Sequence, residues 1–172
     1  MVIETPRLTL RVFDDPDVDA LADVHGDPRV MRFSIGGPKT RDQIARFVHN
    51  TRDHHVRHGF SQWAVVWTAT GRCIGECGIL PQDVGGAREH EISYRLNPNF
   101  WGRGIATEAA AACRDYGFAT LGLDRLVSII DPHNTASIRV AGKVGMVREK
   151  SGVFHGIPVG IYAIRRGAAP SS

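Results

Sequence analysis

The sequence predicts an α/β fold in which one mixed, mostly antiparallel sheet carries helices on both faces. Strand and helix patterns follow one another in the order β-α-α-β-β-β-α-β-α-β-β along the 172 residues. Three successive strand patterns in the middle of the chain predict an antiparallel meander. The third of these strands and the next are separated by a long helix pattern, which requires a parallel crossover. A sheet with both pairings is expected to lie between two layers of helix.

The N-terminal elements are marked by alternation and by capping signals. Apolar and polar side chains alternate over residues 5–12, which predicts a half-buried strand. The Asp-Pro pair at residues 15–16 supplies an N-cap and a first-turn proline, and the helix that follows ends at Gly26. Residues 40–43 form a capping box, which opens a second helix that ends at Gly59.

The remaining elements are bounded by glycine, proline and asparagine. Strands are predicted at residues 62–68, 73–80, 89–96, 126–130, 146–150 and 157–164. A helix over residues 103–121 contains a run of four alanines, which are strong helix formers. A shorter helix over residues 134–144 is closed by Gly145 at the position after its C-cap.

Length and composition indicate one globular domain. At roughly 150 residues per domain, we assign residues 1–166 to a single domain and residues 167–172 to a flexible tail. Hydrophobic residues make up 42% and charged residues 23%, which argues against a disordered chain, a collagen-like repeat and a coiled coil. No run approaches the roughly 18 apolar residues of a membrane span, and no secretory signal is visible at the N-terminus.

The three cysteines indicate a reducing compartment, and we therefore expect a cytoplasmic protein. An odd, sparse number does not suit a disulfide framework. Cys73 and Cys77 are four residues apart, so we place them on the same face of one strand as plain buried thiols. No metal site is predicted, because His54 and His58 lie one helical turn apart but lack a third ligand.

The glycine-rich turn at residues 97–108, NPNFWGRGIATE, carries the strongest functional signal. It lies between a predicted strand and a predicted helix. Gly102, Gly104 and the small Ala106 let a ligand approach the backbone closely, and Arg103 adds a cation. The first amides of a helix have no partner within it and lie at its positive end. The turn therefore predicts an anion site suited to phosphate or pyrophosphate, with a ligand-free tight turn as the alternative. The net charge of +3 suits an anionic ligand but is too small to indicate nucleic acid.

This turn resembles the acyl-CoA pyrophosphate loop of the GNAT acetyltransferases. Gly104 and Ala106 occupy the last two fixed places of that family's signature, and Trp101 stands where Gln or Arg is usual. The Rim-type acetyltransferases of ribosomal-protein N-termini share this departure, and FWGRGIATEA at residues 100–109 is similar to their motif throughout. Further ordered similarities extend over nearly the whole chain, including the segment at residues 134–146.

The resemblance implies that acetyl-CoA is the co-substrate and that the acetyl group passes directly to an amine. In the family, pantetheine lies between two splayed strands and a backbone N–H stabilises the oxyanion, here near Tyr94 to Leu96. The resemblance also places Asn134 on the pantetheine arm, with helix capping as its alternative role, and Ser137 near the thiol. The coenzyme-binding residues implied in this way are Tyr94, Leu96, Trp101, Gly102, Arg103, Gly104, Ile105, Ala106, Thr107, Asn134 and Ser137.

The reaction also needs a base, because an amine arrives mostly as ammonium. Glu91 and Glu76 are the candidates, each on a central strand, and His90 is a third. The alternative for each glutamate is an ion pair with a nearby arginine, such as Arg88 or Arg95. Alternation places Glu91 and Arg95 on one strand face and Tyr94 on the other. Relatives carry a Tyr general acid one turn after Ser137, where this chain has Ala141, so the thiolate would leave unassisted, through Ser137 or through water.

We therefore expect an N-acetyltransferase acting on a protein or peptide N-terminal α-amine. The alternatives are an aminoglycoside or polyamine acetyltransferase, a non-catalytic acyl-CoA-binding module and, more distantly, a nucleic-acid binder. We expect a monomer or a homodimer that binds an amine-bearing acceptor but neither nucleic acid nor a membrane.

Overall fold

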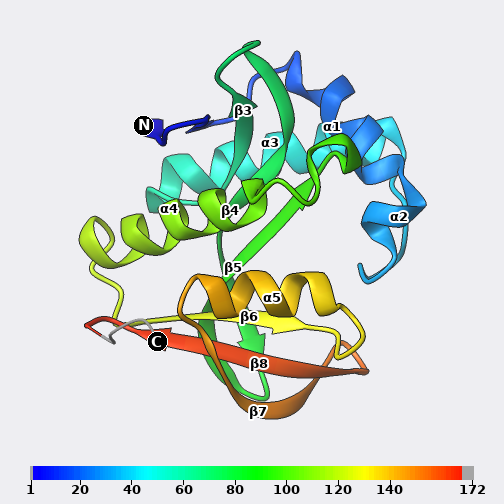
Figure 1. Ribbon diagram of the computed structural model, residues 1–172. Helices are drawn as coiled ribbons and strands as arrows, with labels where there is room; N and C mark the ends of the chain where they lie inside the picture. The colour runs from blue at the N-terminus through cyan, green and yellow to red at the C-terminus, as the bar shows by residue number, and fades with distance from the viewer. Residues whose placement is uncertain (1, 168–172) are drawn as a thin grey trace.

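The structure is a computed structural model that describes residues 2–167, and its centre is one eight-stranded sheet (Figure 1). The strands lie in the order β1-β2-β3-β4-β5-β6-β8-β7. All neighbours pair antiparallel except β5 and β6, which are parallel. The predicted mixed sheet, central meander and parallel crossover are thereby confirmed. The strands are β1 (Val2–Glu4), β2 (Leu8–Arg11), β3 (Gln62–Trp67), β4 (Arg72–Val84), β5 (Ala87–Leu96), β6 (Arg125–Ile130), β7 (Val147–Phe154) and β8 (Ile157–Arg165).

The helices begin and end at the residues that the local chemistry favours. Thr40 and Gln43 form the predicted capping box, and Gly59 ends the same helix in the left-handed conformation. Asn134 caps the last helix with its side chain, and Gly145 follows it at φ +86°. The helices are α1 (Asp17–Gly26), α2 (Pro28–Met31), α3 (Arg41–His58), α4 (Ile105–Ala119) and α5 (Thr135–Lys143), with a 3-10 turn, η1, at Pro98–Phe100.

The sheet separates two layers of helix. The larger core lies on the α4 and α5 face and contains residues such as Trp63, Ile105 and Leu126. The second core lies on the α1 and α3 face around Phe13 and Ile44. Figure 1 shows α4 and α5 in front of the sheet, with α1 and α3 behind it. Helices on both faces confirm the predicted layering.

A β-bulge in β4 corrects the prediction that Cys73 and Cys77 share a face. The register of β3 with β4 shifts so that Val65 lies opposite Gly75 and Val66 opposite Cys73, which leaves Ile74 as the extra residue. Cys77 therefore packs in the α4 and α5 core, 3.4 Å from the Sγ of Cys113. Cys73 packs against the core on the opposite face.

Several elements also differ from the prediction: α2 was not predicted, and the strand predicted at residues 146–150 is β7, which runs on to Phe154. The strand β1 was not predicted, because three residues are too few to show a pattern. Helix α1 begins at Asp17, so its N-cap is Pro16, which offers no side-chain acceptor, and the predicted cap Asp15 instead accepts from Arg52 at 2.5 Å. Strand β4 runs on to Val84 and forms a long hairpin with β5. The predicted tail at residues 167–172 lies, beyond its first residue, outside the described residues.

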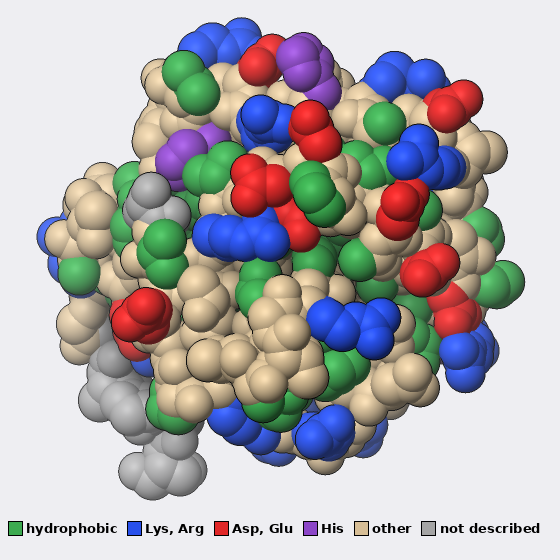
Figure 2. All heavy atoms as spheres, turned by 90° about the horizontal axis from the view of Figure 1, so that it is seen from above, with side chains coloured by type: hydrophobic (Ala, Val, Ile, Leu, Met, Phe, Trp, Pro, Cys, Tyr) green, Lys and Arg blue, Asp and Glu red, His purple; other side chains and the backbone are tan. Residues whose placement is uncertain are grey.

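The charges on the surface are mixed. On the face shown in Figure 2, basic and acidic side chains lie interspersed among the described residues. On this face, no continuous basic stripe of the kind that tracks a nucleic-acid backbone is visible. Within residues 2–167, no helix has the length and apolar content needed to cross a membrane.

Candidate active site

The sheet opens between its two parallel strands. Between β5 and β6, the described residues form a single register pair, Glu91 with Val127, whereas every other neighbouring pair of strands forms three or more. Just beyond this pair, the two strands are joined by a side chain, because the Ser128 hydroxyl donates to the carbonyl of Ile92 at 2.9 Å. The strands therefore separate toward their C-terminal ends, which lead into the glycine-rich turn and into α5.

The glycine-rich turn presents an uncapped helix N-terminus. Gly102 and Gly104 have φ of +73° and +76°, a conformation that other residues adopt only with strain. Gly104 is the N-cap of α4 and offers no side chain to the first amides of the helix. A Cβ built on Gly102 meets no atom within 4 Å, so the turn is open to a ligand. Exposed backbone donors at a positive helix end form a site for a phosphate group.

Arg7 fixes this turn from the N-terminal segment. Its Nη1 donates to the carbonyl of Arg103 at 2.9 Å, and its Nε and Nη2 each lie 2.7 Å from Oε2 of Glu108. Burial acts to raise the pKa of Glu108, but hydrogen bonds from Thr5 and Arg7 outweigh it and lower that pKa. The Glu108 carboxylate in the first turn of α4 therefore stays ionised, but the positive charge of Arg7 compensates it, so it does not oppose an anion nearby.

The predicted coenzyme residues lie around the opening and on the α4 and α5 face. Tyr94 and Leu96 belong to β5, and the Tyr94 hydroxyl donates to the carbonyl of Ser137 at 3.4 Å. Burial raises the pKa of the Tyr94 phenol, so it stays protonated. The Trp101 indole donates to the carbonyl of Leu96 at 2.9 Å, which ties the turn to the strand. The side chain of Ile105 is buried in the core, so only its amide can face a ligand.

Arg103 and the first turn of α5 complete this set. The Arg103 guanidinium lies 5.3 Å from the Trp67 ring centroid and 5.5 Å from that of Phe100, which fixes the cation beside the turn. Ala106 and Thr107 lie in the first turn of α4. Asn134 Oδ1 accepts from the backbone N–H of Ser137 at 3.1 Å, so the capping role is present for Asn134. Ala141 is buried in the core.

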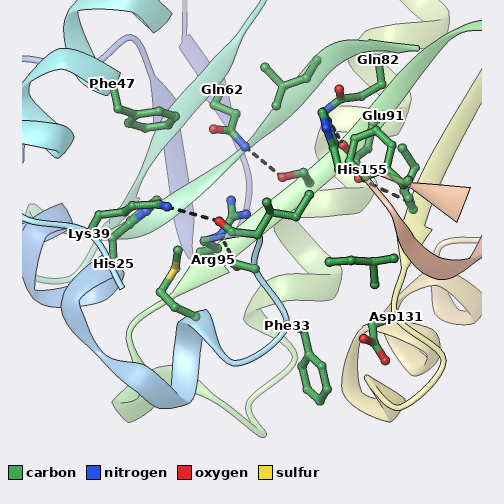
Figure 3. A pocket seen from close by; sticks show the side chains of 18 of the residues that line it. His25, Phe33, Lys39, Phe47, Gln62, Gln82, Glu91, Arg95, Asp131 and His155 are labelled. Carbon is green, nitrogen blue, oxygen red and sulfur yellow. Dashed lines mark hydrogen bonds between the residues drawn. The ribbon is translucent and has the colours of Figure 1, made fainter. Parts of the chain in front are cut away.

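A large pocket lies on the opposite face of the sheet, toward α1 and α3 (Figure 3). Its volume is about 720 Å³. Side chains from the α1–α3 region, from β3 to β6 and from the turn between β7 and β8 line it, and those used below are His25, Ser34, Lys39, Arg46, Gln62, Gln82, Glu91, Ser93, Arg95, Asp131 and His155. Glu91 and Ile129 lie on the two strands that separate, so this pocket reaches the opening from the side opposite α4.

Glu91 is the carboxylate at this meeting point. Its side chain is almost fully buried, and it accepts from Gln82 Nε2 at 2.9 Å and from the backbone N–H of Ile129 at 3.4 Å. No Lys, Arg or His among the described residues forms an ion pair with it. Burial raises its pKa, and the two hydrogen bonds only partly offset that rise. A desolvated carboxylate with a raised pKa is suited to accept a proton near neutral pH.

Glu76 lies beneath the pocket instead of lining it. Its side chain is 0% exposed, with Oε1 2.8 Å from Arg95 Nη1 and 3.4 Å from His25 Nε2. Burial acts to raise the pKa of Glu76, but His25 and Arg95 outweigh it and hold that pKa below its usual range. The ion pair with Arg95 considered as an alternative for Glu76 is therefore present.

The sequence model of the acetyltransferase (GNAT) domain family matches residues 7–147. The Bacillus subtilis protein YkkB is 36% identical over 159 residues, which cover 92% of each chain. This chain belongs to the GNAT acetyltransferase family. It is therefore an enzyme, an N-acetyltransferase, and the GNAT fold uses acetyl-CoA as its co-substrate.

Solved GNAT structures share the architecture. A GNAT acetyltransferase from Bacillus anthracis superimposes with a TM-score of 0.84 at 29% identity, covering 96% of this chain and 98% of its own. A ribosomal L7/L12 α-N-protein acetyltransferase, RimL, in complex with coenzyme A superimposes with a TM-score of 0.79 at 21% identity, covering 96% and 98%. At this identity the second likeness is one of fold.

Sequence reasoning did not identify the residues of this GNAT acetyltransferase that surround Glu91. Six separate chain segments build the pocket, so no local motif marks it. One available signal was strand alternation, which placed Glu91, Ser93 and Arg95 on one face of β5. Within residues 2–167, no three His, Cys, Asp or Glu side chains are grouped to hold a metal ion.

Proposed function

We propose that the enzyme transfers the acetyl group of acetyl-CoA directly to the N-terminal α-amine of a peptide or protein held in the pocket. The observation that carries this proposal is the position of Glu91. It lies where the opening between β5 and β6 meets a pocket on the opposite face. A thioester reaching in from the α4 side and an amine from the pocket side would meet there without a covalent enzyme intermediate.

The coenzyme is held by the turn and by the opening. The amides of Arg103, Gly104, Ala106 and Thr107 bind the pyrophosphate, and Gly102 gives it room. Trp101 and Ile105 hold the turn in place through the indole hydrogen bond and core packing. Asn134 and Ser137 face the pantetheine arm at the start of α5, and a β5 amide near Tyr94 to Leu96 donates to the developing oxyanion.

Proton transfer is the chemistry left to the side chains. Glu91 takes a proton from the acceptor ammonium, directly or through one water, and the free amine attacks the thioester carbon. The C–N bond forms and the C–S bond breaks. The nitrogen then gives up its second proton, and the departing thiolate gains one, so the charges balance. The hydroxyl of Ser137, or water, is the donor to that thiolate, because Ala141 is buried and has no polar group. Glu76 is a positioning residue, because it holds the guanidinium of Arg95 in place.

The acceptor class is supported by motif and by charge. The motif at residues 100–109 is similar to that of Rim-type enzymes, which act on protein N-termini. A polyamine or an aminoglycoside carries several positive charges, and Lys39, Arg46 and Arg95 line the same pocket. Like charges at close range oppose such an acceptor. The chain is a Rim-type enzyme in this proposal, and a small polycation is the alternative.

The test is thiol release from acetyl-CoA with a panel of acceptors. Peptides with a free N-terminus are expected to turn over, whereas the same peptides with a blocked N-terminus are not. Faster turnover with spermidine or an aminoglycoside than with any free peptide would overturn the acceptor class. Coenzyme binding without turnover on any amine would instead favour the non-catalytic module.

A further inference from the structure

The pocket that holds Glu91 is lined by more cationic side chains than carboxylates. Three formal cations line it, Lys39, Arg46 and Arg95, against two carboxylates, Glu91 and Asp131. Only Arg95 is paired with a carboxylate among the described residues, and that carboxylate is the buried Glu76. The Lys39 ammonium contacts only a carbonyl, that of Ile35 at 3.2 Å. Lys39 and Arg46 are therefore pocket cations that have no carboxylate partner among the described residues.

Arg95 is held in place with part of its guanidinium free. Its Nη1 donates to Glu76 and its Nε to the hydroxyl of Ser34 at 3.1 Å. The structure gives Nη2 no partner among residues 2–167, and the side chain is 28% exposed toward the pocket. A buried carboxylate thus fixes an arginine that still has a donor to offer. An arginine fixed in this way binds a carboxylate at little further entropic cost.

The two carboxylates of the pocket are already engaged. Asp131 Oδ1 accepts from the backbone N–H and from Nδ1 of His133, at 2.8 and 3.0 Å. Glu91 is desolvated and bound by Gln82. Figure 3 shows Lys39, His25 and Arg95 on one side of the pocket, and Glu91, Gln82 and His155 on the other. A bound molecule would therefore meet a proton acceptor at one end and cations at the other.

Gln62 lies between these ends and has a free acceptor. Its Nε2 donates to the hydroxyl of Ser93 at 2.9 Å, and Ser93 lies between Glu91 and Arg95 on the same face of β5. The buried Oε1 of Gln62 has no hydrogen-bond partner among the described residues. An unpaired buried acceptor is costly unless a ligand donates to it. A peptide N–H is a donor of the right kind.

We infer that this pocket selects an amine that carries a carboxylate several bonds away, namely a peptide N-terminus whose second or third residue is acidic. The α-amine faces Glu91, a backbone N–H of the peptide donates to Gln62 Oε1, and the acidic side chain binds Arg95 and Lys39. Four residues along a strand span about 13 Å, and the side chains of Arg95 and of the acidic residue shorten that gap. This inference rests on the proposed function, because it names the substrate class of the same site.

The test compares peptides that differ in one side chain. The peptide Ser-Ala-Glu-Gly-Gly-Tyr amide is matched with versions carrying Gln or Lys at the third position, and a second set moves the change to the second position. We expect kcat/KM at least tenfold higher for Glu than for Gln, with Lys lowest. Equal values for Glu and Gln, or a preference for Lys, would overturn the inference.

Variants assign the selectivity to residues. Arg95→Gln is expected to bring the Glu-to-Gln ratio near one, mainly by raising KM for the Glu peptide, and Lys39→Gln to lower the ratio several-fold. Arg41→Gln, an exposed change on α3 outside the pocket, serves as the charge-matched control and should leave the ratio unchanged. Because Arg95 also compensates the charge of Glu76, circular dichroism is used to check that the Arg95→Gln variant folds. If it does not fold, the result for Lys39→Gln decides whether the inference stands. The inference is refuted if the Glu-to-Gln ratio is unchanged in a folded Arg95→Gln variant. Where Arg95→Gln is unfolded, an unchanged ratio in Lys39→Gln refutes it.

Small amines separate this inference from the proposed function. If no peptide is acetylated, the peptide acceptor fails, and 5-aminopentanoate, its amide and 1,5-diaminopentane become the matched set. Faster turnover of the acid then supports selection of a carboxylate, and faster turnover of the diamine refutes it. If nothing turns over, calorimetric titration of the Glu and Gln peptides into the coenzyme-loaded protein gives the same comparison as affinities, and equal affinities refute the inference.

Discussion

Arg95 Nη1 lies 2.8 Å from Oε1 of Glu76, a carboxylate that is completely buried under the pocket. This pair joins β4 to β5 at the register position where the two residues face each other. This ion pair distinguishes the roles of Glu76 and Glu91, the two acidic residues that the sequence offers as bases. Glu76 is committed to Arg95 and His25, whereas Glu91 keeps a desolvated carboxylate at the pocket wall.

Glu76→Gln is expected to affect folding more than proton transfer. Removing the buried charge is expected to cost up to about 3 kcal/mol of unfolding free energy, because Arg95, which is mostly buried, loses its carboxylate partner. Urea unfolding measures this loss. In the folded fraction, the acidic limb of the pH profile of kcat/KM should keep its wild-type position. Movement or loss of that limb would identify Glu76 as the base.

Glu91→Gln is expected to lower kcat by about 10²–10⁴-fold, the range for a lost general base. The wild-type rate should rise with pH through the raised pKa of Glu91, because only the ionised carboxylate accepts a proton. That limb should vanish in the variant, while calorimetric affinity for acetyl-CoA stays unchanged. A variant with normal turnover across pH would exclude Glu91.

Gln82→Met tests the same assignment without touching the carboxylate. Gln82 donates to Glu91 Oε2 and stabilises its charged form. Without that donor the pKa of Glu91 rises further, so the acidic limb should move to higher pH, with the rate on its plateau largely kept. Initial rates between pH 5 and 9 give the limb, and a shift to lower pH contradicts the assignment.

Gly104→Ala is expected to weaken coenzyme binding. The residue has φ +76° at the N-cap of α4, where an L side chain costs about 1–2 kcal/mol and reorients the first helical amides. KM for acetyl-CoA should rise about tenfold or more. Gly85→Ala is the control, since Gly85 has φ +61° in the β4–β5 turn and carries the same strain away from the coenzyme. Equal effects of the two variants on KM would show that strain alone is responsible.

Glu108→Gln is expected to remove a pH-dependent part of stability. The pKa of Glu108 is lowered in the fold, so its contribution is present above the ordinary value of 4.5 and is lost as pH falls through the lowered one. At pH 7 the variant should lose about 1–2 kcal/mol, since its partners bind a charge. Urea unfolding from pH 7 to pH 3 should show the difference between wild type and variant shrinking, whereas Asp19→Asn, in an exposed pair with Arg41, should cost little at any pH. A constant difference would contradict this account.

Local patterns predicted much of the fold and identified the glycine-rich turn before α4. The capping box at Thr40 and the glycines of the turn are fixed by backbone requirements that sequence displays directly. Strand alternation likewise placed Glu91 and Arg95 on one face. Contacts between distant segments could not be predicted from local patterns. Arg7 and Glu108 are 101 positions apart, and nothing in the sequence near either residue indicates the other.

The pocket beside Glu91 could not be predicted from the sequence for the same reason. Its walls come from α1 to α3, four strands and the β7–β8 turn, and they meet only when the sheet forms. The bulge at Ile74 could not be predicted either, because it depends on the register of two paired strands and not on the composition of either.

That bulge also determines which changes β4 can accept. A Cβ on Gly75 would lie 2.1 Å from the carbonyl oxygen of Arg95, so any side chain there would push β4 away from the strand that carries Glu91 and Arg95. Loss of the single residue Ile74 would restore regular alternation and move Cys73, together with everything before it on the strand, to the other core. In evolutionary terms, the length of this segment is constrained more strictly than the composition of its positions other than Gly75, so family members that share both cores should vary in sequence here before they vary in length.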